Sequence, residues 1–181
     1  MNITKLQQKR ILRRALLGLL VFLTAMAQNV PWLPVVYGAR GFPLLPLVVA
    51  IAFYDQPVPA ILYAALAGIL WDISFGGYHA IYLTLIAFLC AVVMRYFLNR
   101  NFITISLLSL ATAIVYFLVR WFATYAFLPG LTPLQITAPL LTESLPNLGY
   151  TMLMTPLMFF LVSLIVRRTS RRQIEIKESG A

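Results

Sequence analysis

The chain has 181 residues, of which 61% are hydrophobic and only 10% are charged, and its mean hydropathy is +0.88. Soluble domains are about 45–50% apolar and about 25% charged. A single core in a chain of this length cannot hide so much apolar surface from water. This argues against a soluble enzyme, a disordered chain and a disulfide-rich secreted module. The composition therefore predicts an all-α, polytopic membrane protein with little mass outside the bilayer.

The net charge of +9 comes from 14 Lys and Arg residues against five Asp and Glu residues. In a soluble protein such an excess would suggest a nucleic-acid partner. No basic and aromatic motif for RNA or DNA binding accompanies it here, so we expect no nucleic-acid partner. The single cysteine, Cys90, lies in an apolar run and is expected to be a small core residue.

Six apolar runs, separated by polar, Gly or Pro breaks, predict a bundle of six transmembrane helices. They cover residues 15–30, 42–54, 58–71, 80–98, 103–128 and 146–166. The second run spans about 20 Å as a helix, against roughly 30 Å of hydrocarbon, so it must start earlier, tilt little or lie in a thinned bilayer. The rather apolar connection over residues 131–145 is predicted to lie along the interface as a short amphipathic helix.

Basic residues predict the orientation of the spans. With six spans and a cytoplasmic N-terminus, twelve of the 14 Lys and Arg residues fall on the cytoplasmic side, Arg40 lies outside, and Arg120 lies within the fifth run. Residues 1–14 then form a basic cytoplasmic N-terminus, residues 15–166 the transmembrane domain, and residues 167–181 a basic cytoplasmic tail. The basic ends either determine topology or contact anionic lipid or an acidic cytoplasmic partner.

Reactive side chains are sparse along the chain. It has one histidine and one cysteine, and it lacks the HExxH, paired CxxC, P-loop and GxGxxG motifs. Metal, thiol and nucleotide chemistry would therefore lack their ligands. We expect no catalytic residues, no metal and no cofactor, and predict that the protein is not an enzyme.

Small residues recur at helical spacing in the third run. Ala60, Ala64 and Gly68 step by four residues and end in register with Asp72. Small side chains let helix backbones approach closely in lipid, where apolar burial does not drive association. The pattern predicts a helix-packing seam that ends in a polar anchor near the outer boundary.

Arg120 is the one basic residue expected within a span, and it needs a partner there. An arginine at mid-bilayer costs at least about 2.5–3.5 kcal/mol on insertion scales, so it normally faces protein or water. Asp72 and Arg120 lie at compatible depths in the outer half, which predicts an ion pair between them. Glu143, in the outer connection, is the rival partner.

Other polar groups also gather towards the outer half. Asn147, Thr151 and Thr155 step by four residues in the last run, and His79 stands at the start of the fourth, where we expect a hydrogen-bonded end group. Two outcomes remain open. The polar groups line an outward small-molecule pocket, or they pin loops that present a surface to a membrane-bound partner.

Two short motifs resemble the signature of the rod shape-determining protein MreD family. They are Gly68-Ile69-Leu70-Trp71-Asp72, at the end of one span, and Gly76-Gly77-Tyr78-His79-Ala80, at the start of the next. The arginine in the fifth span and Asn147 near the start of the sixth are also similar, and the likeness covers residues 11–170. The chain departs from the pattern at Gly41-Phe42-Pro43, where many relatives carry a proline-aspartate.

This resemblance implies a non-catalytic component of the bacterial elongation machinery in the cytoplasmic (inner) membrane. Its implied partners are an MreC-like bitopic membrane protein, the glycosyltransferase RodA with a class B penicillin-binding protein, the MreB cytoskeleton and membrane lipid. The implied fold is similar to the membrane substrate-binding components of energy-coupling vitamin transporters. We expect the small-residue seam and an apolar groove to bind the partner's transmembrane helix. The alternative is a small-molecule-binding component of an uptake transporter.

Overall fold

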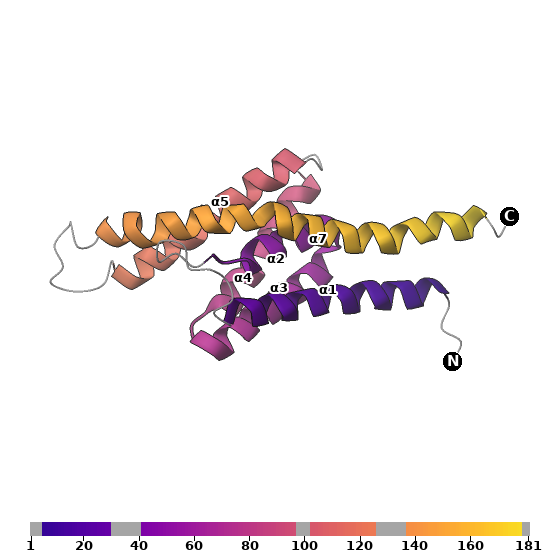
Figure 1. The fold of residues 1–181 in the computed structure, drawn as a ribbon, viewed down its shortest axis with the longest axis horizontal. Helices are drawn as coiled ribbons and strands as arrows, with labels where there is room; N and C mark the ends of the chain where they lie inside the picture. Colours follow the sequence, from indigo (N-terminus) through magenta and orange to yellow (C-terminus); the bar gives the residue numbers. More distant parts are fainter. Residues whose placement is uncertain (1–4, 30–40, 97–101, 126–136, 179–181) are drawn as a thin grey trace.

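The computed structural model describes residues 5–29, 41–96, 102–125 and 137–178, and every regular element within them is helical (Figure 1). The elements are α1 (Lys5–Asn29), α2 (Leu44–Tyr54), α3 (Pro57–Phe75), α4 (His79–Tyr96), α5 (Phe102–Tyr125), the π-helical turn η1 (Leu140–Ser144) and α7 (Leu145–Glu178). Helices α1, α3, α5 and α7 are long and apolar enough to cross a membrane, whereas α2 and α4 are shorter apolar helices. The prediction of an all-α, multi-pass membrane bundle is confirmed at this level.

Helix α2 lies at the centre of the bundle and is enclosed along its length. Residues 41–53 are all buried, and α2 contacts α1, α3, α4, α5 and α7. A helix that is apolar on every side is buried in a protein or in a membrane, and here the five neighbouring helices bury it. The helix begins at Leu44, two residues after the start of the apolar run, so the option of an earlier start is wrong. Because other helices cover α2, its length does not have to match the hydrocarbon thickness.

The helices around α2 turn large apolar side chains outward. Leu62, Ile73 and Leu153, for example, are 65%, 76% and 71% exposed. Exposed apolar side chains on this scale fit an environment of lipid tails and not one of water. The inner faces meet in one apolar core that includes Leu17, Leu83 and Val162.

The small-residue face of α3 packs inside the chain. Ala60 and Ala64 are 1% and 0% exposed, and Gly68 is buried. At Gly68 the backbone of α4 approaches so closely that a Cβ atom would lie 2.2 Å from the Cα of Ala80. The expectation that this seam binds a partner's helix is therefore wrong, since neighbouring helices of the same chain already cover it.

The last helix is longer than expected at its start. Residues 137–139 are helical and continue through η1 into α7, so that residues 137–169 form one helical stretch. The described part of the connection is thus the beginning of the last span and not a separate interfacial helix, and residues 131–136 lie outside the described residues. The start of α1 and the end of α7 lie at the same end of the bundle (Figure 1), which we call the terminal end, and the opposite end is the far end.

Replacing Gly68 by alanine tests the close crossing of α3 and α4. The added Cβ would meet the α4 backbone, which cannot move aside as a side chain can, so we expect Gly68→Ala to cost about 3 kcal/mol. Gly149→Ala is the matched control, because a Cβ on that helical glycine meets nothing within 4 Å. Thermal unfolding of the purified chain in detergent should show a lower midpoint for Gly68→Ala and an unchanged or higher one for Gly149→Ala. Equal midpoints would contradict the crossing.

Candidate functional site

Asp72, at the end of α3, holds the start of α4. Its Oδ1 accepts the backbone N–H of His79 at 2.9 Å, and its Oδ2 accepts the backbone N–H of Ala80 at 2.9 Å. The same Oδ1 lies 2.8 Å from Nδ1 of His79, with which it forms an ion pair when the imidazole is protonated. The first N–H groups of a helix have no partner within the helix, so a carboxylate from the preceding helix here does the work of an N-cap.

Two glycines allow the chain to reverse direction between α3 and α4. Gly76 and Gly77 have φ angles of 71° and 114°, in the region that side-chain-bearing residues rarely adopt. The N–H of Gly76 closes the end of α3 by donating to the Asp72 carbonyl at 2.8 Å. The chain therefore reverses within a few residues and brings His79 back onto the carboxylate seven positions earlier.

Aromatic rings from four segments surround this turn. Phe42, which precedes α2, stacks on Tyr116 of α5 with ring centroids 4.8 Å apart and meets Trp71 of α3 edge-on at 5.2 Å. The imidazole of His79 lies 5.5 Å from Trp71 and 6.1 Å from Tyr116. We call Phe42, Trp71, Asp72, His79 and Tyr116 the far-end cluster. It ties α2, α3, α4 and α5 together at one point.

The expected ion pair between Asp72 and Arg120 is wrong. Both residues are described, and the carboxylate of Asp72 contacts His79 and Ala80 instead. Arg120 is exposed on α5, one helical turn beyond Tyr116, and α5 packs chiefly on α7 and α2. Similar depth in the bilayer therefore does not bring the two side chains together. The rival partner, Glu143, is exposed in η1, and no ion pair joins these two described side chains.

Helix α7 fixes the chain where it enters α2. The N–H of Phe42 donates to the hydroxyl of the fully buried Thr151 at 3.0 Å, and that hydroxyl donates to the carbonyl of Asn147 at 2.7 Å. One turn on, the buried hydroxyls of Ser109 and Thr155 lie 3.3 Å apart and join α5 to α7. The stepped polar residues of the last span thus act as internal links, and the hydroxyl of Thr151 makes the contact to α2.

An ion pair at the terminal end escaped the sequence reading. Arg13 of α1 binds the carboxylate of Asp55, which follows α2 and is 6% exposed. Nearby, the hydroxyl of Tyr63 donates to the carbonyl of Arg14 at 2.9 Å. The available signal was one acid in a polar break on the same side of the membrane as five bases, although the sequence did not say which base would reach it.

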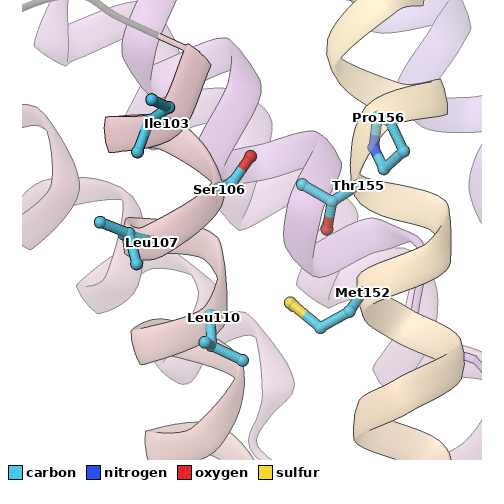
Figure 2. A pocket seen from close by; sticks show the side chains of 7 residues that line it. All are labelled: Ile103, Ser106, Leu107, Leu110, Met152, Thr155 and Pro156. Carbon is cyan, nitrogen blue, oxygen red and sulfur yellow. The ribbon is translucent and has the colours of Figure 1, made fainter.

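A groove of about 390 Å³ opens between α5 and α7. It is lined by Ile103, Ser106, Leu107, Leu110, Met152, Thr155 and Pro156. Figure 2 shows Ser106 and Thr155 pointing toward one another across it, with Leu110 facing Met152 one turn further along. Pro156 has no N–H to donate, so the carbonyl of Met152 loses its usual helical partner beside the groove. The groove is therefore apolar, with polar groups on its floor.

The chemistry available in the described residues is limited. No group of three or more His, Cys, Asp or Glu side chains comes together there to hold a metal ion. The Asp72–His79 pair resembles the pairing that orients a catalytic imidazole. Both oxygens of Asp72, however, also hold backbone N–H groups of α4. These contacts hold the end of α3 to the start of α4, and we call Asp72 with the groups it binds, His79 and the N–H of Ala80, the clasp.

No family model, curated protein or solved structure matches this chain.

Asp72→Asn tests the clasp. The amide keeps one acceptor oxygen and turns an N–H donor toward a backbone N–H, so one charge-assisted hydrogen bond is lost and a donor faces a donor. We expect a loss of about 2–3 kcal/mol, measured as a lower unfolding midpoint in detergent. Glu143→Gln removes the same charge from an exposed position in η1 and should change stability by less than about 0.5 kcal/mol. Equal shifts for the two variants would show that Asp72 acts only through its charge.

Proposed function

We propose that this chain is a non-catalytic membrane scaffold of the bacterial cell-elongation (rod) complex, and that it binds the transmembrane helix of an MreC-like bitopic partner. One observation carries the proposal. The residues that resemble the MreD signature form a single packing device, in which Gly68 admits the backbone of α4 and Asp72 holds its first N–H groups. These residues pack helices together, as a scaffold requires, and their contacts are explained without a chemical reaction.

The proposed topology has six passes through the inner membrane with both termini in the cytoplasm. An even number of passes agrees with the start of α1 and the end of α7 lying at one end of the bundle (Figure 1). The two short helices count as passes in this proposal, since α2 is enclosed by its neighbours and α4 packs along α3. The bases at the terminal end then face the cytoplasm, as positively charged flanks usually do.

The groove between α5 and α7 is the proposed seat of the partner helix. The sequence analysis expected the small-residue seam of α3 to bind this helix. Because the chain itself covers that seam, we assign the binding to the groove. In lipid, a carbonyl that has lost its helical partner favours a ligand that brings a hydrogen-bond donor with it. A transmembrane helix with a small polar residue at the crossing meets that requirement, whereas a lipid tail does not.

Within the proposed complex, the scaffold stands beside RodA and its class B penicillin-binding protein, the MreB cytoskeleton and membrane lipid. It contributes no bond-making step to peptidoglycan synthesis. Its contribution is to hold the partner's helix, and through it the partner's outer domain, in a fixed orientation. The clasp at the far end keeps α2 to α5 in register while the groove is occupied.

A narrowed groove tests this function. In pull-downs from mild detergent, with an MreC-like bitopic protein co-expressed, we expect Leu110→Trp to recover at least tenfold less partner than the unchanged chain. Leu118→Trp, the same substitution at an exposed position two turns along α5, should recover a normal amount. Both variants must unfold at the midpoint of the unchanged chain. Equal recovery of the partner by both variants would contradict the groove as the binding site. No recovery by the unchanged chain would contradict the proposed function.

One observation favours the alternative, a small-molecule-binding component of an uptake transporter. The amide oxygen and nitrogen of Gln28, near the far end of α1, are buried and make no hydrogen bond in the structure of the described residues. Buried amide groups normally have a partner, which a bound small molecule would supply. A solute that co-purifies with the unchanged chain and is lost from Gln28→Leu would assign this second function.

A further inference from the structure

Four exposed arginines gather at the terminal end of the bundle. Arg10 and Arg14 lie one turn apart on α1, and Arg167 and Arg168 are adjacent on α7. We call these four residues the arginine collar. Arg13 is not part of it, because its guanidinium group already binds Asp55.

The two halves of the collar lie at the same level of the bundle. Helices α1 and α7 contact each other, and Leu17 and Val162 belong to one buried cluster against which Leu20 and Val166 pack. Arg14 precedes the first of these residues by three positions, and Arg167 follows the last by one. In Figure 1 the basic ends of both helices extend beyond the rest of the bundle on the same side.

That level coincides with the edge of the hydrocarbon. The apolar sequence of the last helix ends at Val166, and Arg167 and Arg168 are the first charged residues after it, at the point where a span leaves the hydrocarbon. Arg167 and Arg168 therefore stand at the depth of the lipid phosphates. On α1, Leu19 and Phe22 follow Arg14 on the hydrocarbon side and are 52% and 46% exposed, so apolar surface lies beside the charges.

The charge of the collar is not neutralised within the described structure. Among the side chains that the structure describes at this end, Asp55 is the one acid, and it binds Arg13. None of the four collar arginines makes an ion pair with a described side chain. Guanidinium groups bind phosphate oxygens in a bidentate manner, and each base near an anionic membrane surface strengthens binding about fivefold.

We propose that the arginine collar binds the phosphodiester headgroup of an anionic phospholipid in the cytoplasmic leaflet, between α1 and α7. Exposed apolar side chains on the hydrocarbon side of the arginines favour a lipid over a soluble phosphate or an acidic protein, since acyl chains can lie along Leu19 and Phe22. The proposal rests on the orientation given under the proposed function. Its test needs no bitopic partner, so its failure would leave the partner-binding proposal standing.

Native mass spectrometry of the full chain, released from detergent with added lipid, tests the proposal. Dioleoyl phosphatidylglycerol is compared with dioleoyl phosphatidylcholine, which has the same tails and no net charge. We expect phosphatidylglycerol to bind more tightly, and Arg167→Gln with Arg168→Gln to weaken its binding about 30-fold. The matched control, Arg171→Gln with Arg172→Gln, removes the same charge one turn beyond the boundary and should weaken binding less than threefold.

Three results would overturn the proposal. The first is equal retention of the two lipids by the unchanged chain. The second is an equal loss of phosphatidylglycerol from both pairs of variants, which would indicate diffuse attraction and no site at the boundary. The third is displacement of the lipid by glycerophosphoglycerol or polyglutamate at the lipid's own concentration, which would assign the arginines to a soluble phosphate or to an acidic protein.

Discussion

The bond that the rest of the bundle depends on joins the Asp72 carboxylate to the first N–H groups of α4. Each unsatisfied backbone group inside a membrane costs several kcal/mol, and a helix that starts near the hydrocarbon has few waters to turn to. One side chain at the end of α3 satisfies two such groups and also fixes the ring of His79. The glycine turn then locks α3 and α4 into a hairpin, and Phe42 and Tyr116 close around it.

This clasp divides the molecule into a fixed part and an open part. At the far end, rings and hydrogen bonds join α2 to α5, and Thr151 adds α7 through the N–H of Phe42. Between α5 and α7, by contrast, a groove of about 390 Å³ remains beside Pro156. The proposed scaffold function needs this combination, because a partner helix can be oriented only by a surface that does not itself rearrange. At the terminal end the Arg13–Asp55 pair fixes α1 in a similar way.

Hydropathy predicted the all-α, multi-pass fold class, since exposure to lipid dictates apolar runs, whereas the orientation read from loop charge stays a prediction. The same reasoning singled out Asp72 and His79 but paired the acid with Arg120, because depth along a helix is readable from sequence whereas neighbours around its axis are not. The pair of glycines between Asp72 and His79 was the signal for their contact. Likewise, four-residue spacing located the small face of α3 around Gly68 without telling whether this chain or another would cover it.

The central claim is that the molecule works by holding another protein's helix in the groove between α5 and α7. Photo-crosslinking in living cells tests it most directly, with a benzoylphenylalanine placed at Leu107 in the groove or at the equally exposed Leu62 on α3. The account predicts a covalent product at Leu107, identified by mass spectrometry as a one-span protein with a large outer domain, and none at Leu62. A product with that protein at Leu62 and none at Leu107 would contradict it.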